Sequence, residues 1–406
     1  MKAAASLPLL FLLACCSLLD PDFPGGHSRT EGGSPARDSV FAQDEGHIWL
    51  SAVEYPEGYD WKRDTARGVV PCRLVLFRDG KQVVEIVLRQ EGVTPEADMH
   101  RIAGGHLYTD YVTPEGETVI GCDGTERFRY PGRELIRGFL LDGGAVYTLG
   151  QNRDGPGFSY RKDGIALFTC SDAVPVGAYG PGSRRSGALY RDNDALCFAW
   201  YTTTEKRHYR LWRDGDIREL ELPEGSTLFD IRSVQGQDIV TYGSNGRLLL
   251  RRGEESKKWT PNAAVTGCRI LPDPADDQWG FSLLARLRRP GGKQYDVLIR
   301  SSGAGRTLAG ANYSTDYQLL PGGEAGVSMN PEGKVACIEW MGLTDTTAAL
   351  RYRILMGPQC IYFTENEALV ALTGDFGQNG ASPAIWNRGE LRTVLLSGYL
   401  TGIAYD

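Results

Sequence analysis

One short phrase recurs along the chain and constrains its fold more than any other feature. Each copy is a run of alternating apolar residues, a basic residue, a turn that ends in glycine, and a second alternating run. Looser copies end at Gly132, Gly253, Gly303, Gly357 and Gly389, and three stricter ones, at 76–80, 160–164 and 211–215, contain Asp-Gly. Asp-Gly between alternating segments predicts a β-hairpin, because a type I′ turn needs positive φ at both central residues.

The phrase belongs to a longer repeat. A strand-like segment precedes each copy, and these segments begin near His47, His106, Ala145, Ala195, Asp238, Gly280, Lys334 and Ala368. The turn glycines advance by about 44 residues on average, which is the length of a four-stranded propeller blade. Helical periodicity is nearly absent. The sequence therefore predicts an all-β fold, a β-propeller of four-stranded blades with eight repeat units, and seven blades as the alternative.

The C-terminal segment predicts how the propeller closes. Elsewhere the segment after a hairpin leads into the innermost strand of the next unit, as at 230–234, but residues 397–406 have no further unit behind them. We expect Ile403-Ala404-Tyr405 to complete the blade that begins at Ile48, because pairing the two ends removes an exposed sheet edge.

The N-terminus has the features of an exported protein. Lys2 precedes a twelve-residue apolar stretch, 3–14, which has the length of a secretory signal and is too short to span a bilayer. Residues 15–45 are rich in Ser, Asp, Pro and Gly, which predicts a flexible tether. The predicted organisation is a signal peptide at 1–14, a tether at 15–45 and a β-propeller at 46–406.

The segment Leu12-Leu13-Ala14-Cys15 resembles the lipobox of bacterial lipoproteins. In that family the signal is cut before the cysteine, which is then acylated. The resemblance implies that Cys15 is the lipidated residue, with Cys16 as the alternative, and that the protein is anchored to the outer membrane of the cell envelope. Each buried CH₂ contributes roughly 0.8 kcal/mol, so several acyl chains anchor a protein stably. An ordinary secretory signal is the other interpretation.

The repeat itself resembles the β-propeller lipoproteins of Bacteroidetes. The resemblance rests on a Val-Tyr-x-x-Gly strand, as at 146–150, followed by a Trp-basic-Asp-Gly turn, as at 212–215, and it covers 46–406. It implies the fold and the envelope location, and it supplies no catalytic residues. The signatures of WD repeats, kelch repeats and sialidase Asp boxes are absent from the sequence. Asp64-Thr65-Ala66 is similar to the O-glycosylation sites of these bacteria, which makes Thr65 a candidate glycosylation site.

Composition limits the remaining function classes. A net charge of −7 argues against nucleic acid as a partner, since nucleic-acid-binding proteins usually carry a basic stripe. Beyond Cys15 and Cys16, seven cysteines are scattered without a C-x-x-C pair, which predicts neither a zinc knuckle nor a disulfide framework.

Candidate metal ligands are few. Asp98, His100 and His106 form a small cluster in the sequence, but no third strong ligand accompanies the two histidines. We interpret them as polar residues at strand ends and expect no metal site and no cofactor. The acidic segments 192–194 and 273–277 do not match the twelve-residue calcium loop, and we interpret them as solvated turns.

The join between the second and third strands of each unit varies most in length, and it is longest in the first unit, at 56–71. Variable loops on a rigid scaffold are where binding groups usually lie. Tyr59 and Trp61 are therefore candidates for stacking on a ligand, with Lys62 and Arg63 orienting its acidic or hydroxyl groups. Alternatively, the two aromatic residues are buried anchors that hold the loop in place.

These features favour a lipoprotein whose propeller binds, or acts as a scaffold for, a glycan or protein partner. No catalytic residues can be assigned. The alternative is a carbohydrate-active enzyme, a hydrolase or lyase, with carboxylates in the central funnel.

Overall fold

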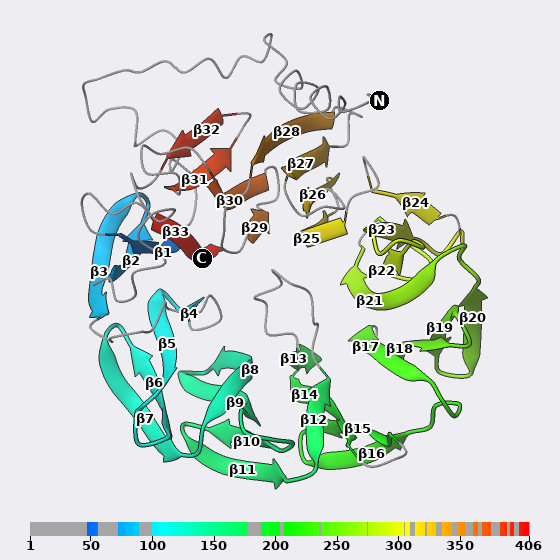
Figure 1. Cartoon of the computed structure of the whole chain (residues 1–406), viewed down its shortest axis with the longest axis horizontal. Helices are drawn as coiled ribbons and strands as arrows, with labels where there is room; N and C mark the ends of the chain where they lie inside the picture. Colours follow the sequence, from blue (N-terminus) through cyan, green and yellow to red (C-terminus); the bar gives the residue numbers. More distant parts are fainter. Residues whose placement is uncertain are drawn as a thin grey trace, which may run out of the picture.

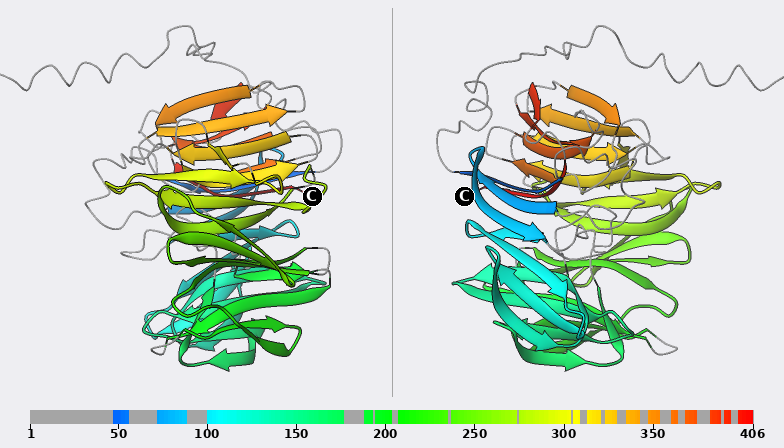
Figure 2. Two further views of the ribbon diagram at one scale, coloured as in Figure 1. Left: turned by 90° about the vertical axis from the view of Figure 1, so that its right-hand side faces the viewer. Right: turned by 60° about the vertical axis from the view of Figure 1, so that its left-hand side comes forward.

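The computed structural model describes residues 47–55, 72–88, 100–176, 188–192, 194–203, 207–234, 237–273, 275–303, 305–308, 313–320, 323–329, 335–342, 347–353, 360–363, 368–374, 382–387, 390–393 and 398–405. All elements of this part of the chain are β-strands, and they form eight antiparallel sheets. The sheets follow one another around a common centre (Figure 1), and side views show their strands stacked across the molecule (Figure 2).

We number the sheets along the chain and give their strands from the centre outward. Sheet 1 contains β33 (Gly398–Tyr405), β1 (Ile48–Glu54), β2 (Cys72–Arg78) and β3 (Lys81–Leu88). Sheet 2 contains β4 (His100–Ala103), β5 (His106–Val112), β6 (Glu117–Cys122) and β7 (Thr125–Pro131). Sheet 3 contains β8 (Glu134–Asp142), β9 (Ala145–Asn152), β10 (Phe158–Lys162) and β11 (Ile165–Cys170). In sheet 4, β12 (Ala173–Val176) and β13 (Leu189–Asp192) both pair with β14 (Ala195–Thr202), followed by β15 (Tyr209–Arg213) and β16 (Asp216–Leu220).

The second half of the chain continues in the same way. Sheet 5 contains β17 (Thr227–Val234), β18 (Gln237–Ser244), β19 (Arg247–Arg252) and β20 (Glu255–Trp259). Sheet 6 contains β21 (Ala264–Pro272), β22 (Phe281–Arg288), β23 (Gln294–Ile299) and β24 (Gly305–Thr307). Sheet 7 contains β25 (Tyr313–Leu320), β26 (Gly323–Met329), β27 (Val335–Gly342) and β28 (Thr347–Arg353). Sheet 8 contains β29 (Cys360–Phe363), β30 (Ala368–Gly374), β31 (Ser382–Asn387) and β32 (Glu390–Thr393).

The all-β, four-stranded repeat predicted from the sequence is confirmed. In seven of the eight sheets the second strand begins within one residue of its predicted position, from β1 at Ile48 to β30 at Ala368. The prediction succeeds because each of these strands combines an alternating apolar face with turn residues on either side. In sheet 7 the segment predicted near Lys334 is the third strand, β27, and the second strand begins earlier, at Gly323.

The aspartate of the outer hairpin turn holds each of the first four sheets together. In sheet 3, Asp163 and Gly164 have φ of 48° and 80°, as a type I′ turn requires. The Val146 amide N–H donates to Asp163 Oδ1 over 2.9 Å, and the Asp163 N–H donates to the Val146 carbonyl over 2.8 Å. The turn between the third and fourth strands is thus tied to the start of the second. Asp79, Asp123 and Asp214 make the same pair of bonds to Ile48, Leu107 and Leu196.

Two predicted turns are wrong. The hairpin predicted to end at Gly357 is misplaced, because the third and fourth strands of sheet 7, β27 and β28, both end before that residue. The sequence placed the hairpin of the second unit at Pro131-Gly132, whereas the structure places it at Asp123-Gly124, between β6 and β7. Asp123 has a φ of 50° and its carboxylate accepts the bond from Leu107. Gly132 instead lies in the connection from β7 to β8. Pro-Gly is a strong turn signal in itself, but it lacks the aspartate that makes the bond across the sheet.

We expect Asp163→Ala to lower the free energy of unfolding by about 1–3 kcal/mol, because it leaves the Val146 amide without its acceptor and puts alanine at positive φ. Asp163→Asn keeps the acceptor oxygen and tolerates positive φ, so it should retain most of the stability. Urea unfolding of the two variants tests this. An alanine variant as stable as the wild type would show that the bond is not needed.

The two ends of the described chain share sheet 1. β33 pairs antiparallel with β1, with Ile403 opposite Leu50 and Ala404 opposite Trp49, and a register shift lies between Ser51 and Ala52. This pairing was predicted from the sequence. The backbones of β33 and β1 lie so close together that a Cβ at Gly398 would collide with the carbonyl oxygen of Val53.

Removing residues 398–406 should therefore lower the free energy of unfolding by several kcal/mol. The deletion removes the hydrogen bonds between β33 and β1 together with the buried area of β33, and it leaves β1 as an exposed edge strand. Gly398→Ala tests the same pairing with a single methyl group. Thermal and urea unfolding measure both effects.

Gly132→Ala is the matched control, because Gly132 also has positive φ, at 100°, but has no atom within 4 Å of its Cβ position. Both alanine variants carry roughly 1–3 kcal/mol of backbone strain. Because of the collision with Val53, Gly398→Ala should lower the free energy of unfolding clearly more than Gly132→Ala does. Equal losses in the two variants would mean that β33 contributes little to stability.

Aromatic side chains fill the space between sheets 3 and 4. Phe158, Phe198 and Trp200 are buried in one cluster. The Phe158 and Phe198 rings are 5.9 Å apart and meet edge to face, while Phe198 stacks on Trp212 at 5.5 Å. Such ring pairs add about 0.5–1.5 kcal/mol each beyond their buried area, so this cluster fixes how the two sheets pack.

Candidate functional site

A cavity of about 240 Å³ opens between sheets 4, 5 and 6. It is smaller than the roughly 300–1,000 Å³ of typical ligand pockets, so it fits one sugar ring or one side chain of a larger ligand. Its walls come from β12, β14 and β15, from the start of β17, and from β21 to β23 (Figure 1). The lining residues are Pro175, Val176, Tyr201, Arg207, Tyr209, Thr227, Leu228, Phe229, Thr266, Gly267, Cys268, Arg269, Leu284, Arg286 and Asp296.

The connectivity places this cavity on the face opposite the Asp-Gly turns. Arg207 lies in the join between β14 and β15, and Thr227 follows the crossover from sheet 4 to sheet 5. These joins and crossovers meet on one face of an up-and-down sheet, and the Asp-Gly turns lie on the other. We call the first the loop face and the second the turn face. β1 ends and β2 begins on the loop face, at Glu54 and Cys72.

One carboxylate lines the cavity, and it is already paired. Arg286 and Asp296 face each other across β22 and β23. The Arg286 Nε and Nη2 atoms donate to the two Asp296 oxygens over 3.0 and 3.1 Å. The side chain of Asp296 is only 1% exposed, so its charge depends on Arg286 for compensation. This two-point pair fixes the plane of the guanidinium at the cavity wall.

Two further arginines line the cavity. Arg207 is exposed and Arg269 half-buried, and both line the cavity together with Arg286. Three guanidinium groups thus stand against a single lining carboxylate, in a chain whose net charge is −7. Planar guanidinium groups suit carboxylate, sulfate and phosphate, so the cavity can accept an anionic group.

An aromatic wall accompanies this charge. The rings of Tyr201 and Tyr209 lie 5.7 Å apart, and the Arg207 guanidinium lies 5.1 Å from the centre of the Tyr201 ring. The Leu228 amide donates to the Tyr209 hydroxyl over 3.2 Å, which ties sheet 4 to sheet 5. Tyr209 is 3% exposed and Tyr201 is half-buried, so Tyr201 is the ring of this pair that a ligand can contact, while Tyr209 is held by the fold.

Cys268 also lines the cavity and has no disulfide partner. Burial raises the pKa of its thiol, with a further contribution from Asp230. A thiol in such surroundings stays protonated and behaves as a small apolar side chain. It contributes to the shape of the cavity and carries no charge.

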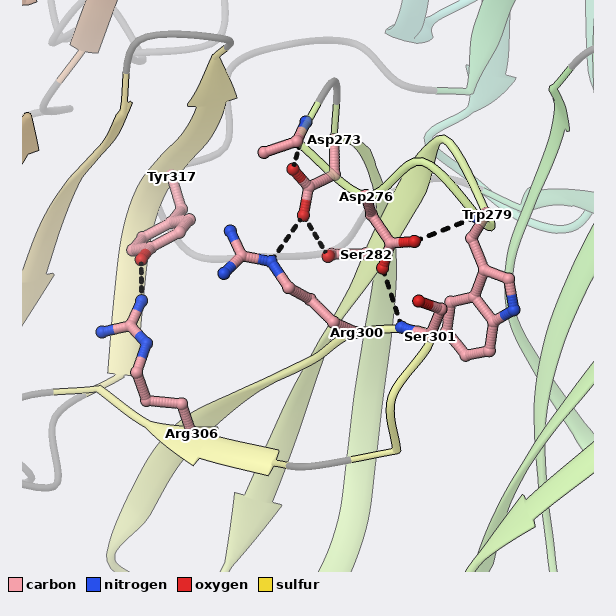
Figure 3. A network of polar contacts seen from close by, with 9 residues as sticks. Asp273, Asp276, Trp279, Ser282, Arg300, Ser301, Arg306 and Tyr317 are labelled. Atoms are coloured by element: carbon pink, nitrogen blue, oxygen red, sulfur yellow. Dashed lines mark hydrogen bonds and ion pairs between the residues drawn. The ribbon is translucent and has the colours of Figure 1, made fainter. Parts of the chain in front are cut away.

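Asp273 and Asp276 of the acidic segment 273–277 are buried where the sequence predicted a solvated turn, whereas Asp277 is exposed. Asp273 is fully buried, and its Oδ2 accepts bonds from Ser282 Oγ over 2.5 Å and from Arg300 Nε over 2.8 Å (Figure 3). Those donors satisfy the carboxylate inside the protein, so the solvated-turn interpretation is wrong for Asp273.

Asp276 ties two loops of sheet 6 together through backbone amides, as the turn aspartates tie a turn to a strand in sheets 1 to 4. Its Oδ2 accepts from the Ser301 amide over 2.8 Å and its Oδ1 from the Trp279 amide over 2.9 Å (Figure 3). These bonds hold the pKa of Asp276 below its usual value, against the opposing effect of burial. The join between β21 and β22 is thereby tied to the turn after β23. Asp192 is buried as well and pairs with Arg213 over 2.7 Å.

His106 and His100 lie apart from the cavity, in sheet 2. His106 begins β5, and its Nδ1 lies 2.6 Å from Asp123 Oδ2, with Cys122 close by. His100 lies in β4, and Asp98 falls outside the described residues. Burial and the Asp123 carboxylate raise the pKa of the Cys122 thiol, so this cysteine is not activated as a nucleophile.

Several predicted site residues fall outside the described residues: Cys15, Cys16, Tyr59, Trp61, Lys62, Arg63 and Thr65. Conversely, sequence reasoning did not single out the cavity arginines. The pair of Arg286 and Asp296 did leave a signal, because the two residues stand at matching positions on either side of Gly291-Gly292. Within the described part of the chain, no helix has the length and apolar character needed to cross a membrane.

Comparisons with known proteins give distant structural similarities. No protein-family model and no curated protein matches the chain. Among solved structures it is similar to the dihydro-heme d1 dehydrogenase NirN, at 13% identity over 77% of this chain and 76% of that chain, with a TM-score of 0.40. An acylaminoacyl peptidase from Pyrococcus horikoshii is 10% identical over 73% of this chain and 51% of that chain, with a TM-score of 0.42.

A post-proline cleaving enzyme from Rickettsia typhi is 9% identical over 74% of this chain and 53% of that chain, with a TM-score of 0.41. This chain thus spans about half the length of the two peptidases. These neighbours are β-propeller proteins. No activity of theirs is carried to this chain.

Proposed function

We propose that this protein is an envelope-anchored binding module whose β-propeller holds an anionic glycan or an acidic segment of a protein partner. A lipid on Cys15 anchors it to the outer membrane, and residues 15–45 act as the tether. The observation that carries the binding role is the cavity on the loop face, where three arginines stand against one paired carboxylate.

The scaffold of this module is a closed propeller of eight blades, one for each sheet. Two observations support it. Each sheet contacts the next along the chain, and β29 to β31 of sheet 8 contact β33 of sheet 1. β33 in turn pairs with β1. Closure removes the two sheet edges that an open array would expose, and it gives the rigidity that loop-borne recognition needs.

Binding is favoured over glycoside hydrolysis at this cavity. A glycoside hydrolase needs two carboxyl groups roughly 5–10 Å apart, one of which must be free to donate a proton. Asp296 is the single carboxylate lining the cavity, and Arg286 compensates its charge. An acidic ligand would bring the missing negative charge itself.

The loop at 56–71 extends this surface in our proposal. It joins β1 to β2 on the loop face. Tyr59 and Trp61 would stack on sugar rings at a separate point of a long ligand, because sheet 1 lies across the molecule from sheets 4, 5 and 6 (Figure 1). Lys62 and Arg63 would add positive charge there. The competing role, in which the two rings anchor the loop, predicts lost stability instead of lost binding when both become alanine.

Oligogalacturonate is a direct probe of the cavity, because its methyl ester keeps the same sugar chain but replaces each carboxylate by a neutral ester. We expect the full-length protein to bind the acid at least about tenfold more tightly than the ester, and Arg207→Gln with Arg269→Gln to remove that preference. A charge-assisted hydrogen bond contributes about 1.5–3 kcal/mol, which corresponds to at least about tenfold in affinity. Titration calorimetry measures both ligands.

Arg247→Gln is the matched control, because Arg247 is an exposed arginine of sheet 5 that begins β19 and does not line the cavity. It should leave the preference unchanged. Equal affinity for acid and ester in the wild type, or equal losses in the control and the cavity variants, would contradict recognition of charge in this cavity.

The anchor has its own test. When cells are labelled with a fatty-acid probe, the Cys15→Ser protein should carry no label, because the thiol that is acylated is gone. The Cys16→Ser protein should be labelled like the wild type. Undiminished labelling of the Cys15→Ser protein would contradict the proposed anchor.

A further inference from the structure

A histidine, a cysteine and an aspartate converge on the turn face of sheet 2. His106 is the first residue of β5, Cys122 the last of β6, and Asp123 follows it in the turn. One ligand atom from each residue lies within 4.8 Å of the other two. The His106 side chain is 54% exposed and that of Asp123 31%, so the group is reachable from solvent.

Comparison with the outer hairpin turns of sheets 1, 3 and 4 shows that the cysteine is the unusual residue of this turn. In sheet 1, His47 Nδ1 lies 2.7 Å from Asp79 Oδ2, just as His106 does from Asp123. The pairing of histidine with aspartate is therefore a feature of the turn. The position of Cys122, however, is basic in each of the other three described Asp-Gly turns: Arg78, Lys162 and Arg213. Arg78 contacts His47 Nε2.

The turn of sheet 2 thus carries a third potential ligand, Cys122, at the position where its counterparts carry a basic side chain, while the guanidinium of Arg127 from β7 lies near the Cys122 thiol. Imidazole, thiolate and carboxylate are together the ligand types of zinc sites. In tetrahedral zinc sites the ligand atoms stand roughly 3.5 Å apart, which the Cys122 and His106 side chains can reach by small rotations about χ1. We propose that His106, Cys122 and Asp123 bind a zinc ion.

The fold already orients the Asp123 carboxylate. Asp123 Oδ1 accepts the Leu107 amide over 2.8 Å, and this bond sets the direction in which Oδ2 points. Binding would replace the contact between Asp123 Oδ2 and His106 by bonds from both to the metal, and the Cys122 thiol would release its proton to water. Three protein ligands leave a fourth position for water or for a donor group from another molecule.

Cobalt is the probe for this site, because a cobalt–thiolate bond absorbs in the near ultraviolet. We expect the full-length, reduced, metal-free protein to develop this absorption with one equivalent of Co²⁺ and to lose it when Zn²⁺ is added. Cys122→Arg should abolish it. His106→Ala should weaken cobalt binding by more than about tenfold. Both variants should fold, because the protein already has these residues at the equivalent positions of other sheets. Arg78 stands at the position of Cys122 in sheet 1, and Ala145 stands at the position of His106 in sheet 3.

His47→Ala is the matched control, since it removes the equivalent histidine from a turn without a cysteine. Its cobalt spectrum should equal that of the wild type. Far-ultraviolet circular dichroism and thermal unfolding verify that each variant is folded. A wild-type protein without the charge-transfer absorption overturns the proposal, as does absorption that persists in folded Cys122→Arg or a loss of equal size in His47→Ala.

Discussion

The bond from a turn aspartate to the start of a neighbouring strand is the interaction on which the repeat depends. Asp163 shows its form: one carboxylate oxygen caps the Val146 amide while the backbone of the turn bonds the Val146 carbonyl. Three strands are thereby fixed by one residue, and a short turn is enough to hold each outer hairpin. This leaves the opposite face of each sheet under little constraint, so its joins can vary in length and in side chains.

Because the turns hold the sheets and the joins on the opposite face can vary, a binding site can arise on that opposite face. The cavity is formed where sheets 4, 5 and 6 meet at the loop face, so it needs no change in the turns that hold the sheets. Asp296 is buried and compensated by Arg286, which orients one guanidinium. Arg207 and Arg269 line the same cavity. A partner with its own negative charge would complete the site.

The repeat could be predicted from the sequence because its signals are local. Asp-Gly, alternating apolar residues and regular spacing identify the strands, and the pairing of Ile403 with Leu50 follows from counting the units. The turn at Asp123 was missed because a cysteine precedes Asp123 where other copies of the phrase have a basic residue, whereas the segment 129–132 contains both a basic residue and a glycine. The cavity was missed for another reason: its walls come from three sheets and span residues 175–296, and no local pattern relates them. The burial of Asp273 likewise depends on Arg300, which is remote in sequence.

The central claim is that the loop face recognises an anionic ligand while the turn face only holds the sheets. Hydrogen exchange of the full-length protein with oligogalacturonate tests it most directly, with the methyl ester as reference. The acid should slow amide exchange around Thr227–Phe229 and Gly267–Arg269, and it should leave the turns at Asp123 and Asp163 unchanged. Slower exchange confined to the turn face, or the same pattern with the neutral ester, would contradict the claim.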